Sequence, residues 1–113
     1  MGCLFGSVLE KKIPAEVVYE SDDALAFRDI RPVAPTHVLV IPKKHVAAMR
    51  ELGPDDAALA GRLLLAATEV ARELGLEASG YRLVVNDGED AGQSVHHIHI
   101  HVLGGRTMAW PPG

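Results

Sequence analysis

The sequence predicts an α+β domain built on an antiparallel sheet of about five strands, with one long and one short helix. Short β-branched and apolar segments separated by turn residues are typical of strands joined by hairpins. A single long stretch with apolar residues at helical spacing is inserted late in the chain. The length of 113 residues and the 48% hydrophobic content suit a single domain, which we expect to span residues 1–113.

The N-terminal part is predicted to form a hairpin. A short apolar segment around Val8 and Leu9 opens the fold. Residues 17–20 are typical of a strand, residues 21–23 of a turn, and residues 24–29 of the return strand.

A central strand is predicted next. Pro32 and Pro35 make residues 30–36 a stiff loop, because proline cannot donate a hydrogen bond to a ladder. Residues 37–41 are β-branched and apolar, as in a central strand, and Pro42 ends this strand.

Two helices follow. Residues 46–52 are predicted to form the short one. Residues 53–56, Gly-Pro-Asp-Asp, are a strong start for the long one, and Gly75 suits its C-terminal cap. Its apolar stripe consists of Leu59, Leu63, Ala66, Val70 and Leu74.

Leu64 and Leu65 widen this stripe beyond one face of the helix. A helix that is apolar over more than one face needs a second surface to cover it. A dimer partner is the simplest candidate, and packing under loops of the same subunit is the alternative.

The C-terminal part supplies the last two strands. Residues 82–86 are predicted to form one of them, residues 87–93 a polar turn, and residues 94–103 the other. Glycines at 104–105 end this strand, and residues 110–113 form an extended tail.

Composition and targeting signals exclude several classes of protein. A net charge of −4 argues against binding to a nucleic-acid backbone. One cysteine excludes an intrachain disulfide and fits a cytoplasmic protein. The start Met1-Gly2-Cys3 misses the myristoylation pattern, because Gly6 stands where Ser or Thr is required. No signal peptide or membrane-spanning run is evident, so we expect no membrane partner.

The most informative pattern lies in residues 93–103, where histidines stand at alternate positions with branched apolar residues between them. Side chains of a strand alternate between its faces, so the three histidines are predicted to share one face. Same-face residues lie about 6.6 Å apart, close enough for three imidazoles to act on one small ligand. They are His97, His99 and His101.

Two chemistries suit such a row. Histidines spaced as His-X-His on a strand can bind zinc. Without a metal, a neutral imidazole is a nucleophile toward phosphorus, and a protonated one stabilises phosphoryl oxygens and donates protons to leaving groups. The structural alternative is that the rings are solvated surface groups, or that one of them is a buried polar group with its hydrogen bonds satisfied; it is disfavoured because three histidines share one face.

The neighbouring residues favour phosphate chemistry over zinc. Ser94 supplies a hydroxyl, Gly92 lets backbone N–H groups approach a ligand closely, and His37 adds a fourth imidazole. Carboxylates that would orient metal-bound histidines are not evident near the motif. We therefore expect no metal and no other cofactor.

The run from His97 to Leu103 matches His-φ-His-φ-His-φ-φ, the motif of the histidine triad (HIT) superfamily. Residues 25–30, 35–45 and 104–113, which end in Trp-Pro-Pro-Gly, resemble its histidine triad nucleotide-binding protein branch. The resemblance covers nearly the whole chain. The dinucleoside polyphosphate hydrolase branch shares the triad but is not expected to share this ending.

The resemblance implies a HIT-like homodimer in which the sheets of two subunits join and each subunit has a nucleotide site. It implies hydrolysis of purine nucleoside phosphoramidates, in which AMP is linked to an amine through a P–N bond, with acyl-adenylates as related substrates. Two other functions stay open: a nucleotide-binding partner protein with negligible turnover, and a zinc site on the triad.

The resemblance also implies a role for each catalytic residue. His99 would attack the α-phosphorus and form a nucleotidyl-histidine intermediate. His101 would hold the phosphate oxygens, and His97 would orient His99, partly through its backbone carbonyl. His37 and Ser94 would contact the leaving group and supply its proton.

Substrate-binding residues are expected around this centre. Asp29 matches the residue that binds the ribose hydroxyls, Asn86 matches a polar contact on the phosphate side, and Trp110 would reach the partner subunit's site. The other expected substrate-binding residues are Ile30, Phe27, Phe5 and Val8 around the base, with Gly92, Gln93 and Val95 beside the histidines.

Some of these assignments have structural alternatives. The apolar residues around the base could simply belong to the core. Asp29 could cap the following turn. Trp110 could be a frayed end, although a tryptophan is costly to leave in water.

Two positions depart from the pattern of this branch. Many bacterial relatives carry Cys-X-X-Cys with zinc near the N-terminus, but here Cys3 is followed by Gly6, so we predict no zinc there. His96 stands where an aromatic or other large residue is expected, and it falls on the opposite strand face from the triad. His45 and His96 are therefore left out of the predicted site.

Overall fold

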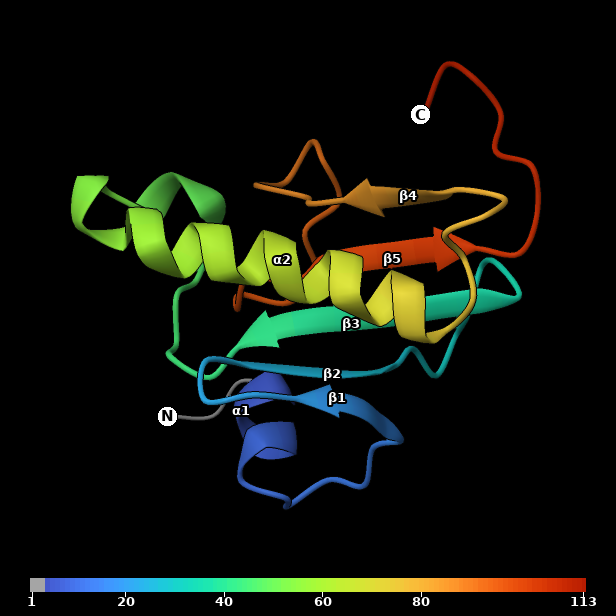
Figure 1. Ribbon diagram of the computed structural model, residues 1–113. Helices are drawn as coiled ribbons and strands as arrows, with labels where there is room; N and C mark the ends of the chain where they lie inside the picture. Colours follow the sequence, from blue (N-terminus) through green and yellow to red (C-terminus); the bar gives the residue numbers. More distant parts are fainter. Residues whose placement is uncertain (1–3) are drawn as a thin grey trace.

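The computed structural model describes residues 4–113 as one antiparallel sheet with a long helix across one face (Figure 1). The order of its five strands is β1-β2-β3-β5-β4, and every neighbouring pair is antiparallel. This confirms the predicted fold class, while the homodimer stays a prediction. The strands are β1 (Val17–Glu20), β2 (Ala24–Arg28), β3 (Thr36–Pro42), β4 (Tyr81–Val84) and β5 (Ile100–Gly104).

The hairpin and the central strand follow the prediction closely, but the histidine strand is shorter than predicted. Residues 94–103 were expected to form a strand, but within this segment the strand β5 begins only at Ile100. The reason is a different backbone partner: the N–H of Ile98 donates to the carbonyl of Val46 at 2.7 Å, in the segment that follows β3. His97 and His99 therefore stand on irregular backbone just before the strand.

The long helix α2 (Ala57–Glu73) starts and ends as predicted. A 3₁₀ turn, η2 (Pro54–Asp56), leads into it. Gly75 has a φ of 77° and lies just beyond its C-terminal end, where the N–H of Leu76 donates to the carbonyl of Ala71 at 2.9 Å. These are features of a Schellman cap, which needs a left-handed residue that glycine supplies without strain.

The short elements were predicted less well. Only the 3₁₀ turn η1 (Met49–Glu51) forms where residues 46–52 were expected to be a helix. The carboxylate of Asp87 accepts the backbone N–H of Arg50 at 3.0 Å, so this donor is not part of a helical ladder. The short helix of the fold is instead α1 (Leu4–Leu9), where the sequence indicated only an apolar segment.

Strand alternation gives the sheet two different faces. On β3, Val38 and Val40 face α2, while His37, Leu39 and Ile41 face the other side, where α1 packs. The core under α2 includes Leu63, Ala66 and Val70 of the predicted helix stripe, together with Ala24, Ala26, Ile100 and Val102 of the strands. The smaller core under α1 consists of Phe5, Val8, Leu25, Phe27, Leu39 and Ile41.

Leu64 and Leu65 lie on the outer side of α2, with exposures of 53% and 69%. The alternative that they pack under loops of their own subunit is therefore wrong. Coverage by a dimer partner stays a prediction.

Two further predictions, on myristoylation and on zinc at Cys3, concern residues outside the described range of 4–113. Within that range, no helix is both long and apolar enough to cross a membrane.

Candidate active site

A pocket of about 410 Å³ opens on the face of the sheet that carries α1. Its apolar wall comes from α1 and β2, and its polar wall from the turn after β2 and from the histidine segment. Nine predicted site residues line it, namely Phe5, Val8, Phe27, Asp29, Ile30, Ser94, Val95, His99 and His101.

His99 is buried, with 6% of its surface exposed, and its ring lines the pocket. Its Nδ1 lies 2.8 Å from the backbone carbonyl oxygen of His97. A carbonyl oxygen only accepts hydrogen bonds, so Nδ1 carries a proton and donates it. In the neutral ring, Nε2 is then left with the lone pair that a nucleophile needs. The rings of Phe5 and His99 pack in a T-shaped arrangement, with centroids 4.9 Å apart.

His97 is 1% exposed and is not among the residues that line the pocket. Its Nε2 donates to the carbonyl of Pro42 at 2.8 Å, and its Nδ1 lies 3.2 Å from Nδ1 of His45. The three histidines therefore do not form one row facing a ligand: His99 and His101 line the pocket, whereas His97 is buried and does not reach it. His45 is a residue that the sequence prediction left out, and its spacing in the sequence gives no signal of this contact.

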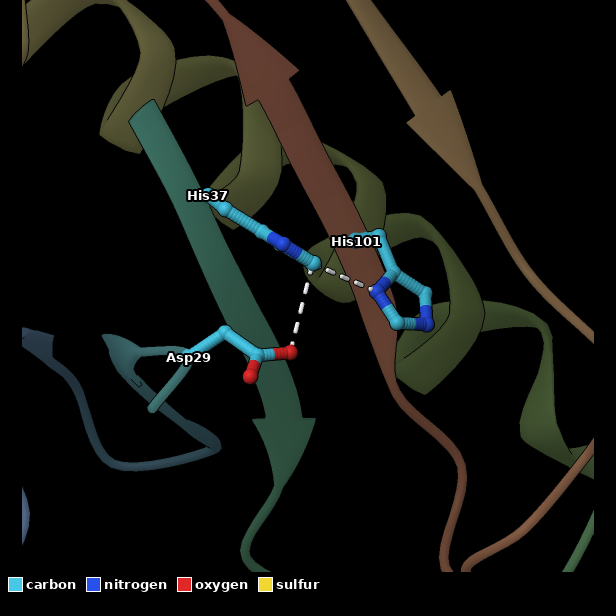
Figure 2. Close-up of side chains that lie close together, drawn as sticks. All are labelled: Asp29, His37 and His101. Carbon is cyan, nitrogen blue, oxygen red and sulfur yellow. Dashed lines mark hydrogen bonds and ion pairs between the residues drawn. The ribbon is translucent and has the colours of Figure 1, made fainter. Parts of the chain in front are cut away.

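His101, His37 and Asp29 form a second cluster, shown in Figure 2. His37 on β3 pairs with Leu103, and His101 on β5 pairs with Leu39, so the two histidines are diagonal neighbours on one face. Nε2 of His37 lies 2.9 Å from Nδ1 of His101 and 3.3 Å from Oδ2 of Asp29.

The sequence prediction gave His37 a contact with the leaving group, and the structure places it differently. Its side chain is 5% exposed, and the backbone N–H of Val33 donates to its Nδ1 at 3.1 Å. Both ring nitrogens thus have protein partners, and His37 is not among the residues that line the pocket. It contacts the pocket wall through His101.

Burial and mutual repulsion keep these imidazoles neutral. Burial is the largest cause lowering the pKa of His101 to about 4; His99 and His37 lower it further, and Asp29 opposes the shift. Burial also lowers the pKa of His37, again against the attraction of Asp29. The pKa of His97 is lowered chiefly by burial; its hydrogen bond to the carbonyl of Pro42 opposes the shift, and His45 and His99 add smaller effects that lower the pKa. These three rings therefore carry no charge at neutral pH.

One group of side chains has the composition of a metal site. Ligand atoms of Asp29, His37 and His101 lie within 4.8 Å of one another, the single such group among residues 4–113. Zinc accepts imidazole nitrogen and carboxylate oxygen at about 2.0–2.2 Å. Whether this cluster holds a proton or a metal depends on which ring nitrogen of His37 carries its proton, because a metal can bind only the nitrogen that has the lone pair. The expected absence of a metal stays a prediction.

Asp29 also caps the turn that follows β2. Its Oδ1 accepts the backbone N–H of Arg31 at 2.8 Å, as in an Asx turn. Asp29 therefore has the capping role that was considered as the structural alternative, and its side chain also lines the pocket.

Gln93 ties down the loop that leads into the histidine segment. Its Nε2 donates to the carbonyls of Ala47 at 2.8 Å and Val95 at 3.1 Å, and its Oε1 accepts the N–H of Gly88 at 2.9 Å. These bonds occupy its amide group, so its contribution is to hold the loop in place. Gly92 in the same loop has a φ of 85°, a conformation that suits glycine.

Six predicted residues are not among those that line the pocket, namely His97, His37, Gly92 and Gln93, described above, and Asn86 and Trp110. Asn86 is half-buried beyond β4. Trp110 is 80% exposed, and its ring lies 5.8 Å from the guanidinium carbon of Arg82. Its contact with a partner subunit stays a prediction.

The sequence prediction also missed several pocket residues. Arg28 and Arg31, close to Asp29 in the sequence, also line the pocket, and Nε of Arg28 is paired with Oε2 of Glu16 at 2.9 Å. Their position beside a predicted ligand-binding aspartate was the available signal. The remaining residues that were missed are Leu4, Ile13, Pro14, Ala15 and Leu39.

The family model described as HIT domain matches residues 10–108 of the chain. The chain belongs to the HIT family. This HIT protein is 51% identical over 110 residues to an uncharacterised HIT-like protein of Synechococcus elongatus, covering 97% of this chain and 96% of the relative.

Solved structures agree with this assignment. The fold is similar to that of a HIT family hydrolase from Legionella pneumophila, with a TM-score of 0.96, 52% identity, and coverage of 99% of this chain and 100% of the other. It is also similar to a histidine triad nucleotide-binding protein from Candida albicans, with a TM-score of 0.83, 30% identity, and coverage of 97% and 83%. The family resemblance is thus confirmed, while membership of the nucleotide-binding branch stays a prediction.

Proposed function

We propose that this HIT protein hydrolyses purine nucleoside phosphoramidates, releasing AMP and an amine. The observation that carries the proposal is the hydrogen bond from Nδ1 of His99 to the carbonyl of His97. It leaves the lone pair on Nε2 of a ring that lines the pocket. The hydrolase name of the Legionella protein supports hydrolysis, and the name of the Candida protein supports nucleotide binding.

The first step is attack of Nε2 of His99 on the α-phosphorus. A bond forms between Nε2 and phosphorus as the bond from phosphorus to the amine breaks. The imidazole gains positive charge, which its Nδ1–H shares with the carbonyl of His97. The amine nitrogen takes up a proton as it leaves. Ser94 is exposed and lines the pocket, so its hydroxyl can relay that proton from water.

The second step regenerates the enzyme. Water attacks the phosphorus, the bond between Nε2 and phosphorus breaks, and AMP is released while a proton goes to solvent. Splitting one displacement into two in this way is the general advantage of a nucleophilic catalyst.

The rest of the pocket suits a nucleoside. Phe27, Val8 and Ile30 provide an apolar wall for a purine base. Asp29, at the polar end, offers carboxylate oxygens to the ribose hydroxyls. Apolar walls with a few fixed polar groups are typical of small-molecule sites.

The test is a comparison of His99→Ala with the parent protein. We expect the variant to lose turnover of an AMP-amine substrate and to bind AMP with an affinity within a few-fold of the parent. His96→Ala, at an exposed position next to the triad, is the matched control and should keep the parental kcat/KM.

Two outcomes contradict the proposal. Parental turnover in His99→Ala would exclude His99 as the nucleophile. A parent protein that binds AMP but has a kcat/KM far below about 10⁴ M⁻¹s⁻¹ on every phosphoramidate tried would instead be a nucleotide-binding partner protein.

A further inference from the structure

The structure assigns to His37 a positioning role: it fixes the proton of His101 on Nε2, the ring nitrogen remote from His37, through a hydrogen-bond chain that starts at the backbone N–H of Val33. This inference rests on the proposed function, because it says how His101 would present a donor to the phosphoryl group. Figure 2 shows the tip of the His37 ring pointing toward both of its side-chain partners, Asp29 and His101.

The first link of the chain sets the tautomer of His37. A backbone N–H can only donate, and the N–H of Val33 points at Nδ1 of His37 at 3.1 Å. Nδ1 must therefore accept. In the neutral ring, which burial favours, the single proton is then on Nε2.

The second link sets the tautomer of His101. The proton on Nε2 of His37 faces Nδ1 of His101 at 2.9 Å and Oδ2 of Asp29 at 3.3 Å. Nδ1 of His101 accepts it, so the proton of the neutral His101 ring is on Nε2. Since His101 lines the pocket, the chain ends in an N–H donor on the pocket wall.

The two pocket histidines are thus held in opposite tautomers. His99 has its proton on Nδ1 and a lone pair on Nε2, whereas His101 has its lone pair on Nδ1 and a proton on Nε2. Their ring centroids are 5.0 Å apart. One ring provides the nucleophile and its neighbour provides a preorganised donor for the developing negative charge, which is how such sites stabilise a transition state.

Val33, where the hydrogen-bond chain begins, is itself held in place. The side chain of Val33 is exposed, with 62% of its surface accessible, so only its backbone takes part. Its carbonyl accepts from Nη2 of Arg106 at 3.1 Å and from Nε of Arg106 at 3.3 Å. Pro32 and Pro35 stiffen the same loop. These features keep the N–H of Val33 aimed at His37.

The same series of hydrogen bonds disfavours a metal ion at the cluster of Asp29, His37 and His101. A metal would need the lone pair of Nε2 of His37, but that nitrogen carries the proton. Moving the proton to Nδ1 would place two N–H donors face to face and break the bond from Val33. Asp29, His37 and His101 therefore hold a proton in preference to a cation.

The direct test is NMR on the ¹⁵N-labelled protein without substrate, since long-range ¹H–¹⁵N correlations distinguish the two tautomers of each histidine. We expect the parent to have His101 protonated on Nε2 and His37 protonated on Nε2. A parent protein in which the proton of His101 is on Nδ1 overturns the inference. This readout needs no turnover, so it stands whether or not the proposed hydrolysis is observed.

A pair of variants tests the cause. His37→Leu removes the donor, and we expect His101 to populate both tautomers and kcat to fall by about 10-fold to 100-fold with little change in KM, because a partly misdirected donor loses only part of the roughly 10²- to 10³-fold that a preorganised donor contributes. His37→Gln keeps an N–H donor near the position of Nε2, and it should restore the single tautomer and most of kcat. An unchanged His101 tautomer in folded His37→Leu overturns the inference.

A cobalt titration tests the metal alternative on the parent protein. Co²⁺ in a site of nitrogen and oxygen ligands gives visible absorption bands. We expect no stoichiometric binding at this cluster. Tight binding of one Co²⁺ per chain that Asp29→Asn abolishes would show that the cluster is a metal site and would overturn the assigned tautomers.

Discussion

Acid should destabilise this HIT protein through the imidazoles of its active site. The pKa of His101 falls from an ordinary value of 6.5 to about 4 in the folded protein, chiefly because the ring is buried. Between these two values the unfolded chain binds a proton that the folded chain does not. Stability is therefore full above pH 6.5 and is lost as the pH falls toward 4.

The size of the effect follows from the shift. A difference of about 2.5 pKa units corresponds to about 3 kcal/mol at 1.36 kcal/mol per unit. The ring lines a pocket that is open to water, and solvent screening reduces the expected loss to about 2 kcal/mol. The pKa values of His37 and His97 are lowered as well, so both residues add losses of the same sign.

The assay is urea denaturation of the parent and of His101→Gln at several pH values from 7 to 4. Carboxylates such as Asp56, whose pKa is lowered chiefly by the backbone N–H of Gly53, titrate in both proteins. The difference between the two pH profiles therefore isolates His101. His96→Gln, which removes an imidazole from an exposed position, should follow the parent.

We expect His101→Gln to lose about 2 kcal/mol less than the parent over this range, whatever its stability at pH 7. Parallel profiles for the two proteins would refute the reasoning, because they would mean that burial does not disfavour protonation of His101.

Three further predictions concern activity and packing. Turnover should fall as the pH approaches 4, because protonation of Nδ1 of His101, whose pKa burial lowers to about 4, would break its hydrogen bond with His37; a kcat/KM that rises toward low pH would contradict a neutral His101. EDTA should leave turnover unchanged, and loss of activity that Zn²⁺ restores would show a metal-dependent site. Gly104→Ala should destabilise the fold by about 1–3 kcal/mol in urea denaturation, because its Cβ would lie 2.7 Å from both terminal methyl groups of Leu76. Parental stability of this variant would show that the side chain of Leu76 can move aside.

Much of the fold could be predicted because local pattern and tertiary packing agree. Alternation on β3 separates Val38 and Val40 from Leu39 and Ile41, and both faces of the sheet are covered as that alternation requires. The Gly-Pro start and the Gly75 cap of α2 are local signals that tertiary contacts do not override. By contrast, α1 has 6 residues, too few for helical periodicity to show.

The site was predicted only in part, because several of its contacts join distant segments. His45 meets His97 across 52 positions of sequence, and Ile98 leaves the sheet to bond Val46. Strand periodicity alone placed His97 in a common row with His99, but both residues precede β5, where the backbone does not form the hydrogen bonds of a sheet. The buried position of His37 depends on Val33 and Asp29, whose contacts with it come from the loop between β2 and β3.

The stereochemical course at phosphorus tests the role of His99 most directly. A phosphoramidate of AMP made chiral at phosphorus with isotopically labelled or sulfur-substituted oxygen would be hydrolysed by the parent protein and the product configuration determined. Two successive in-line displacements, the first by the imidazole and the second by water, predict net retention. Net inversion would mean that water attacks the substrate in one step, and the imidazole would then not be the nucleophile.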